Sequence, residues 1–404
     1  MSIQRPRAAS AGAFVFLALA ALVLAGCRPQ ETVSTFVPRE RTVSGEPRAF
    51  LMGFSDVPGS LTEDAYTGLF DLTANYGEVI LIQRRSSWAE FLPGARVSEA
   101  LEREVVAARD AARARGLQVV AALDPFDPTQ RGRLGSLPAE YSGRSLADGD
   151  LRRAFVAEAS YLARALKPEF MVLGTEVNAT FERNPEGYFA FLEAYAEAYD
   201  AVKAASPRTQ VMVTYQFEEF MGVVPELPPH APRWDLLDDL GERVDLIGIT
   251  SYPSFAYPTA RKVPPAYYLE LREHTDLPVA FVGVGFASTA GREGVNSGTQ
   301  PEQRRFLQRL LEDADRLGSP LVVWFAAQDL GFAAAPPYDL LATIGLRDTS
   351  DAPKEAWPVW EAASQRPIDV EAAVARRAEL DAQALEAAPP PAEAPTEAPT
   401  PAGD

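Results

Sequence analysis

The amino-acid sequence predicts an α/β fold, a (β/α)₈ (TIM) barrel, and two observations support this prediction. Eight short apolar runs lie between residues 49 and 325, and most are apolar at nearly every position instead of alternating. Such runs are typical of parallel strands that are buried on both faces. Helical patterns, with apolar residues three and four positions apart, separate most of the runs. Eight strands with crossover helices over roughly 315 residues match a barrel with some loop insertions.

The predicted elements follow in chain order. The strands span 49–54, 79–82, 119–123, 170–174, 211–215, 246–250, 279–282 and 321–325. The clearest helices span 97–116, 149–166, 186–205 and 301–317. Gly116 and Gly318 stand where two of these helices should end. An open, doubly wound sheet is the alternative, but no glycine-rich phosphate turn follows the first run, which disfavours it.

The beginning of the chain predicts export. Arg5 and Arg7 precede an apolar run from Ala11 to Gly26, the pattern of a signal peptide over residues 1–27. The letters LAGC at 24–27 resemble a bacterial lipobox, which implies lipid attachment to Cys27. An ordinary signal peptide with an incidental cysteine is the alternative. We therefore expect a lipoprotein of the cell envelope that meets the membrane only through its lipid anchor, on the periplasmic or extracellular face.

The barrel itself is expected over residues 47–365, between two polar segments. Residues 28–46 are predicted to form a tether between the anchor and the barrel. Residues 366–404 are rich in Ala, Pro and Glu and are predicted to be a disordered tail, with room for a short helix over 369–386.

The net charge and the composition limit which ligands and which catalytic groups this protein can use. The formal charge of −18 excludes nucleic acid as a natural partner, since phosphate binding needs a basic face. One cysteine and two histidines, His230 and His274, make a Cys/His metal cluster or a histidine triad a poor expectation. We expect no cofactor and no metal, and the sequence carries no signal of oligomeric state. Carboxylates, tyrosines and amides remain for any chemistry, and a neutral carbohydrate remains as a ligand.

Polar and aromatic residues gather where the predicted strands end, which is the functional end of a barrel. Carboxylates, amides and aromatic rings together suit a sugar, which offers hydroxyl groups and apolar ring faces. A helix N-cap is the alternative role for each acid, and Trp324 could equally belong to the barrel core. The candidate substrate-binding residues are Asp56, Trp88, Asp124, Asn178, Tyr215, Tyr252, Trp324 and Gln328.

Several short motifs resemble those of the retaining glycoside hydrolases that share a (β/α)₈ barrel. The letters LGTEVN at 173–178 are similar to their fourth-strand motif, with the endo-β-1,4-galactanase (arabinogalactan galactosidase) family nearest. The letters IGITSYP at 247–253 are similar to that family's sixth-strand segment. Trp324, GLRD at 345–348, Lys354 and Trp357 also fit, and the resemblance spans 47–362. It implies that Glu176 is the acid/base.

The same resemblance places a nucleophilic glutamate at the end of the seventh strand. The matching letters here are FVGVGF at 281–286, with Gly283 in the glutamate position, and Thr175 replaces the asparagine before the acid/base. A retaining enzyme needs two carboxyl groups roughly 5–5.5 Å apart, and glycine supplies none. Hydrolysis by the standard retaining route is therefore in doubt.

Three hypotheses stay open at this point. The chain could be a non-catalytic, sugar-binding pseudoglycosidase. It could be an O-glycosyl hydrolase with a second carboxylate from another strand, for which Glu218 and Asp329, and also Asp124 and Asp56, are candidates. It could be an envelope scaffold, in which case Trp88, Tyr252 and Trp324 would not share a pocket. A second carboxylate within about 10 Å of Glu176 across the mouth would favour the enzyme.

Overall fold

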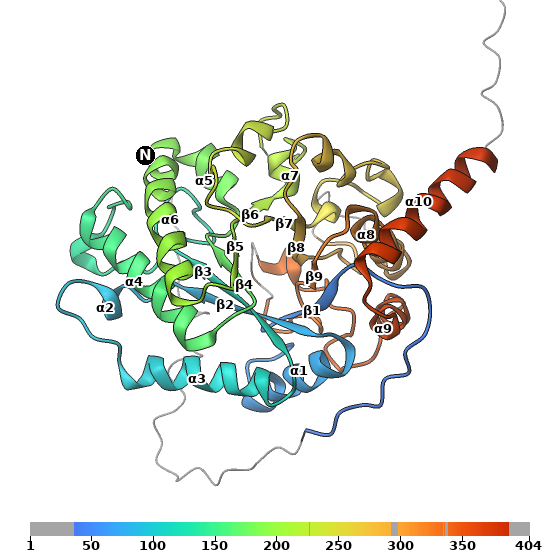
Figure 1. Ribbon diagram of the computed structural model, residues 1–404, viewed down its shortest axis with the longest axis horizontal. Helices are drawn as coiled ribbons and strands as arrows, with labels where there is room; N and C mark the ends of the chain where they lie inside the picture. The colour runs from blue at the N-terminus through green and yellow to red at the C-terminus, as the bar shows by residue number, and fades with distance from the viewer. Residues whose placement is uncertain (1–35, 226, 292–297, 334, 336–337, 388–404) are drawn as a thin grey trace, which may run out of the picture.

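The computed structural model describes residues 36–387, apart from 226, 292–297, 334 and 336–337 (Figure 1). The predicted signal peptide, Cys27 and most of the Pro-rich tail lie outside the described residues, so these predictions stay predictions. No helix within the described residues is both long and apolar enough to span a membrane.

A ring of parallel strands forms the centre of the molecule and confirms the predicted barrel. The order of neighbours is β5-β4-β3-β2-β1-β9-β8-β7-β6. β5 and β6 are two halves of one barrel strand, separated only by Val213, whose carbonyl accepts a hydrogen bond from Gly248 at 3.1 Å. The ring therefore runs through Val213, and eight barrel strands result. The strands are β1 Leu51–Ser55, β2 Val79–Arg85, β3 Gln118–Asp124, β4 Phe170–Leu173, β5 Gln210–Met212, β6 Thr214–Gln216, β7 Ile247–Ser251, β8 Val279–Val284 and β9 Leu321–Trp324.

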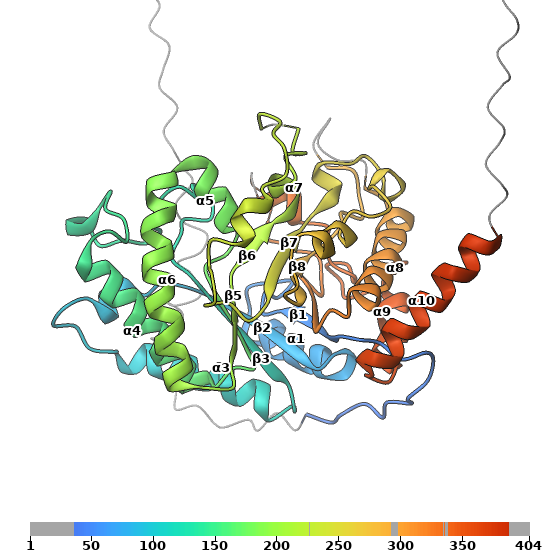
Figure 2. The same cartoon turned by 45° about the horizontal axis from the view of Figure 1, so that its top comes forward.

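Helices surround this ring, as Figure 2 shows from a second direction. The four helices that the sequence predicts most clearly appear as α3, α4, α6 and α8. The helices are α1 Glu63–Tyr76, α2 Trp88–Phe91, α3 Glu99–Arg113, α4 Gly149–Leu166, α5 Val177–Arg183, α6 Pro185–Ala205, α7 Phe217–Phe220, α8 Gln300–Leu317, α9 Trp357–Gln365 and α10 Val370–Ala387. Short 3₁₀ helices span Ala139–Tyr141, Trp234–Leu237, Pro253–Phe255, Ala260–Lys262, Leu269–Glu273 and Tyr338–Leu341.

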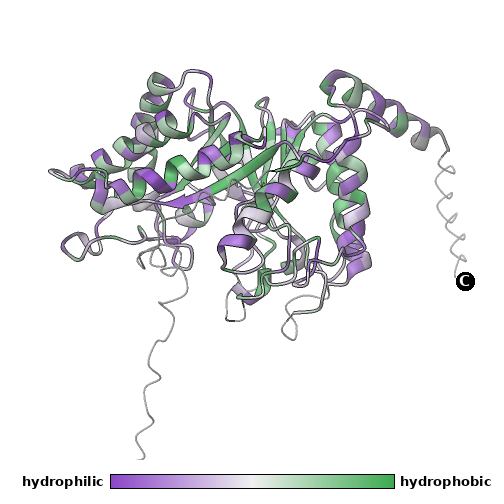
Figure 3. Cartoon of the chain, turned by 90° about the horizontal axis from the view of Figure 1, so that it is seen from below, coloured by the Kyte–Doolittle hydropathy of each residue, from purple (hydrophilic) through white to green (hydrophobic). Residues whose placement is uncertain are grey.

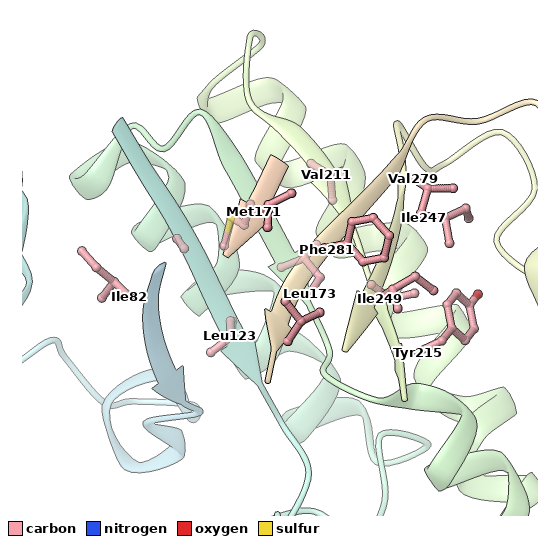
Figure 4. Close-up of a cluster of buried hydrophobic side chains, with 14 of the residues drawn as sticks. Ile82, Leu123, Met171, Leu173, Val211, Tyr215, Ile247, Ile249, Val279 and Phe281 are labelled. Atoms are coloured by element: carbon pink, nitrogen blue, oxygen red, sulfur yellow. The ribbon is translucent and has the colours of Figure 1, made fainter. Parts of the chain in front are cut away.

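Two apolar layers hold the strands in place because successive side chains of a strand point to opposite faces. One layer fills the inside of the ring and includes Leu81, Val172 and Val323. The other lies between the strands and the helices, where Figure 4 shows side chains such as Leu123 and Phe281. In Figure 3 the strands are mostly hydrophobic, and the helices alternate between hydrophobic and hydrophilic residues. The alternation decides which strand-end residues face the barrel mouth.

The two ends of the described chain are tied to each other. Arg48 N–H donates to the Pro367 carbonyl at 2.8 Å, and Asp369 N–H donates to the Arg48 carbonyl at 3.0 Å. Arg366 forms an ion pair with the buried Asp315 at 2.6 Å. α10 then packs against α8, and Arg316 pairs with Asp381 at 2.8 Å. The short helix allowed over 369–386 is therefore present as α10, and residues 366–387 pack against the barrel, beyond the predicted boundary at 365.

Candidate functional site

Glu176 lies at the carboxyl end of β4, on a tight turn into α5. Gly174 has φ of 108°, and a Cβ there would stand 2.7 Å from the Phe191 ring, so glycine is required. Glu176 itself adopts a left-handed backbone, with φ of 53°, which is uncommon for a residue with a side chain. Its N–H donates to Thr214 Oγ1 at 2.9 Å, which anchors this turn to β6.

A polar cluster holds the Glu176 carboxylate at the barrel mouth. Arg131 Nη2 donates to Glu176 Oε2 at 2.9 Å, and Thr250 Oγ1 donates to Glu176 Oε1 at 3.1 Å. The other end of the same guanidinium pairs with Asp124 Oδ2 at 2.5 Å. We call Asp124, Arg131, Glu176 and Thr250 the mouth cluster. Both oxygens of Glu176 thus accept hydrogen bonds, as suits a carboxylate that acts as an acceptor.

The mouth cluster places two carboxyl groups, those of Asp124 and Glu176, against one guanidinium, that of Arg131. Burial raises the pKa of Asp124 above its ordinary value, although the Arg131 guanidinium opposes this shift. Burial would lower the pKa of Arg131, but Asp124 and Glu176 outweigh it and the pKa is raised. Arg131 is therefore a permanent cation between two carboxyl groups. It brings Asp124 close to Glu176, but from the neighbouring strand and not from across the mouth.

Gly283 lies beside the mouth cluster, where β8 carries a bulge. The register of β8 shifts between Val282 and Val284, and Gly283 has φ of 96°. A Cβ at Gly283 would stand 3.6 Å from Thr250 Cγ2 and 3.6 Å from the Tyr252 hydroxyl. The position that the resemblance gives to the nucleophile thus adjoins Thr250, which bonds Glu176, and it offers no side chain.

An aromatic cluster borders this position on its other side. Tyr252 stacks on Phe255 with ring centroids 5.7 Å apart and meets Phe325 edge-on at 6.0 Å. Phe332 and Tyr338 pack around the same group. Phe255, Phe325, Phe332 and Tyr338 are only half-buried, so the group is not a closed core. We call these five residues the mouth aromatics.

Glu218 and Asp329, the leading candidates for a second carboxylate, are both held by protein groups. Glu218 is fully buried and accepts hydrogen bonds from Gln216 Nε2, Ser251 Oγ, the Tyr252 N–H and the Tyr267 hydroxyl. Burial raises the pKa of Glu218. Asp329 forms an ion pair with the buried Lys354 and accepts from Gly345 N–H at 3.1 Å. The described contacts give both acids structural partners in the barrel wall and its loops.

Four of the predicted sugar contacts are buried and bonded within the protein. Trp88 Nε1 donates to the Gly135 carbonyl at 2.7 Å, and Trp324 Nε1 donates to the Ile344 carbonyl at 2.7 Å. The Tyr215 hydroxyl donates to the Leu236 carbonyl at 2.9 Å, on the helix side of its strand. The Asn178 amide bonds the backbone of Gln216 in both directions. Trp88, Tyr252 and Trp324 therefore do not line one pocket, because two of them pack between strands and helices.

Asp56 and Gln328 also lie away from the mouth cluster. Asp56 follows Phe54 on the helix side of β1 and accepts from Gln83 N–H at 3.2 Å. Burial raises the pKa of Asp56 to about 7. Gln328 Nε2 donates to Asp351 Oδ1 at 2.6 Å. Of the predicted sugar contacts, Asp124 belongs to the mouth cluster and Tyr252 to the mouth aromatics.

Sequence reasoning missed Arg131 and Thr250. Arg131 stands seven positions after Asp124 in an irregular connection, where no periodic pattern marks a side chain's direction. Thr250 ends a predicted strand, two positions after Gly248, so both residues point to the same face of that strand. This alternation could have revealed Thr250. Among the described residues, no group of three or more His, Cys, Asp and Glu side chains is arranged to hold a metal ion.

Comparison with known proteins defines the fold. No family model matches the chain, and no curated protein matches it in sequence. An exo-β-1,4-mannosidase from Opitutaceae bacterium strain TAV5 is similar in structure, with a TM-score of 0.59, 17% identity, and coverage of 84% of this chain and 62% of the mannosidase. This chain thus spans about three fifths of the mannosidase's length.

Two further structures share the architecture. A GH5_18 protein from Streptomyces cattleya in complex with GlcNAc has a TM-score of 0.58 and 20% identity, with 82% of this chain and 81% of that protein covered. Xylanase 10B from Thermotoga maritima has a TM-score of 0.56 and 12% identity, with 82% and 97% covered. At these identities the likeness shows the (β/α)₈ barrel fold alone. The resemblance to glycoside hydrolases, and the narrower galactanase assignment, stay predictions.

Proposed function

We propose that this protein binds a poly- or oligosaccharide at its barrel mouth without hydrolysing it by the retaining route. The observation that carries the proposal is the position of Gly283 between Thr250 of the mouth cluster and Tyr252 of the mouth aromatics. A sugar ring placed over Gly283 would meet an acceptor carboxylate on one side and aromatic rings on the other. Hydroxyl groups and apolar ring faces need these two kinds of surface.

The proposal gives Glu176 the role of a hydroxyl acceptor. Both oxygens of its carboxylate already accept hydrogen bonds, from Arg131 at 2.9 Å and from Thr250 at 3.1 Å. The absence of a side chain at Gly283 removes the attacking group that the resemblance would place there. Binding can persist without that group.

A glycan array and a hydrolysis screen with the same glycans, both on the full chain, test this proposal. We expect binding without turnover, and we expect Glu176→Gln to weaken binding by at least about tenfold, the loss of a charge-assisted hydrogen bond. Glu186→Gln is the matched control, because Glu186 is exposed at the start of α6. Turnover that disappears in Glu176→Gln would show an enzyme instead.

An envelope scaffold is the second candidate function. The observation in its favour is that Trp88 and Trp324 are buried with bonded indole groups, so an extended aromatic binding face is smaller than the sequence suggests. If no glycan binds, the scaffold replaces the sugar-binding proposal.

We also propose that the protein is exported and anchored through a lipid on Cys27. The motif LAGC at 24–27 and the single cysteine of the chain support this proposal. Cys27→Ser should move the protein from the membrane fraction to the soluble fraction. A variant that stays in the membrane fraction would contradict the anchor.

A further inference from the structure

The segment that follows the proposed anchor lies against the base of the barrel, the end opposite the mouth. Phe36 lies under the Arg115 guanidinium at 5.7 Å, and Arg115 precedes β3. Arg39 N–H donates to Asn75 at 2.8 Å, near the end of α1, and Arg41 pairs with Glu78 at 2.8 Å, just before β2. Figure 2 shows this segment along the lower side, with α5 and α7, which follow β4 and β6, at the top.

The distance from Cys27 to this base is short. Phe36 lies nine positions after Cys27, and even a fully extended chain over nine positions spans only roughly 30 Å. A lipid on Cys27 would therefore keep the base near the membrane.

The base carries a basic depression beside the entry of this segment. A cavity of about 640 Å³ opens between the ends of α3, α4 and α6 and the starts of β3, β4 and β5. Arg113, Lys167 and Arg208 line it with a single carboxylate, that of Glu169. Arg113 lies two positions before Arg115, which contacts Phe36. We call these four residues the base depression.

Within the residues that the structure describes, two of the three cations in the base depression are not neutralised by a nearby carboxylate. Lys167 and Arg208 are exposed, and no ion pair to either is found in the described part of the chain. The Glu169 carboxylate accepts from Val119 N–H at 2.7 Å. Arg113 donates to the Leu166 and Lys167 carbonyls and thereby holds the rim together. Three cations meet here on a chain whose formal charge is −18.

We propose that the base depression docks onto the phosphates of anionic phospholipid headgroups, so that the barrel stands on the membrane with its mouth facing away. The proposal rests on the proposed anchor at Cys27. Opposite charge attracts clustered Lys and Arg side chains to an anionic bilayer within a Debye length of its surface, and the short connection holds the base within reach. The mouth would then face glycans beyond the membrane.

Förster resonance energy transfer from a dye on the protein to acceptor-labelled lipids tests the orientation of the barrel on the membrane. The full chain is measured in nanodiscs. Glu186→Cys and Ala204→Cys place dyes on exposed positions of α6, about 27 Å apart along its axis. An acylated Cys27 does not react with the dye, so each variant carries one label. In discs that contain phosphatidylglycerol, transfer to acceptor-labelled lipids should be at least twofold stronger from position 204 than from 186. Discs of phosphatidylcholine alone should give a smaller ratio.

Charge variants identify the docking surface. The double variant Lys167→Gln, Arg208→Gln should lower the ratio of energy transfer from position 204 to that from position 186. In anionic discs this ratio should fall to the value found in neutral discs. Arg261→Gln with Lys262→Gln is the matched control, because both side chains are exposed on a 3₁₀ helix that follows β7. This control should keep the ratio. Thermal unfolding of each variant separates docking from folding.

The outcomes distinguish docking from anchoring. Docking would be overturned if the 204-to-186 transfer ratio were equal in anionic and neutral discs, or if the Arg261→Gln, Lys262→Gln control lowered it as much. Either result leaves the lipid anchor on Cys27 in place. A dye-reactive Cys27 would remove the anchor and the docking with it. Sugar binding at the mouth is measured separately and stands in either case.

Discussion

The glutamates that follow β4 and β6 occupy similar places in the sequence but very different surroundings. Glu176 lies on a left-handed turn, keeps a partly exposed carboxylate and shares Arg131 with Asp124. Glu218 lies on the single turn of α7, is fully buried and accepts hydrogen bonds from four protein donors. An acid at a strand end is therefore available to a ligand only where the protein leaves its oxygens accessible.

Glu218→Ala should be the most destabilising of the changes considered. It leaves several buried donors, including Ser251 and Tyr267, without an acceptor, and we expect the free energy of unfolding to fall by about 3–5 kcal/mol. Glu176→Ala should cost only about 1 kcal/mol, since Arg131 keeps Asp124 as its partner. Urea unfolding of the two variants measures both values. Equal losses would contradict the difference between the two sites.

Glu158 extends this contrast to a buried acid with fewer partners. Its carboxylate accepts from Ser87 N–H at 2.9 Å, and burial raises its pKa from 4.5 to about 7. Because the folded pKa lies above the unfolded value, its contribution to stability is present at low pH and is lost as pH rises from about 4.5 to 7. We expect this loss to reach roughly 2–3 kcal/mol.

The pH dependence can be assigned with a single variant. Unfolding of the wild-type chain at pH 5 and pH 8 should show lower stability at pH 8, and Asp56, with its pKa near 7, adds to this slope. Glu158→Gln should remove roughly half of the slope that these two acids produce, because both have a folded pKa of about 7. An unchanged slope in Glu158→Gln would mean that Glu158 is ionised in the folded state at pH 5.

Gly283 should show a smaller effect that concerns the mouth directly. Gly283→Ala places a Cβ on a backbone with φ of 96°, and we expect a loss of about 1–2 kcal/mol. Gly68→Ala is the matched control, because Gly68 lies exposed in α1 with open space around it, and it should gain about 0.5–1 kcal/mol. For the same backbone reason, Gly283→Glu alone should not produce a glycosidase in a hydrolysis screen. Turnover by that variant would show that only the carboxylate is lacking.

Much of the fold follows from local sequence. The apolar runs and helical periods predict the eight barrel strands and the main helices because burial on both faces leaves a pattern within each segment. The break at Val213 and the bulge at Gly283 carry no such pattern, since they depend on register with neighbouring strands. The helix allowed over 369–386 appears as α10, but its attachment to the barrel is not predicted, because Arg366 and Asp381 gain their partners only from α8.

The candidate site was less predictable than the fold. Glu176, Asp124 and Tyr252 were found from their positions at strand ends, and the structure groups the first two in the mouth cluster and the third in the mouth aromatics. Tyr215 is predicted on the wrong side of its strand, and Trp324 takes its alternative role in the core, because one residue of parity turns a side chain from the lumen to the helices. Arg131 comes from a connection, where sequence gives no direction at all. A strand end can be read from sequence, but the side chain's partners come from other strands.

The pairing of Arg48 with Pro367 and Asp369 has a consequence for how the chain can be cut. Residues more than 300 positions apart already touch, so a circular permutant that joins them directly should fold. β1 also pairs with a distant segment, because its neighbour on one side is β9. That edge of β1 therefore has no partner strand until residue 324 has been synthesised. The barrel therefore has high contact order at its seam, and completion of the ring is a late event in folding.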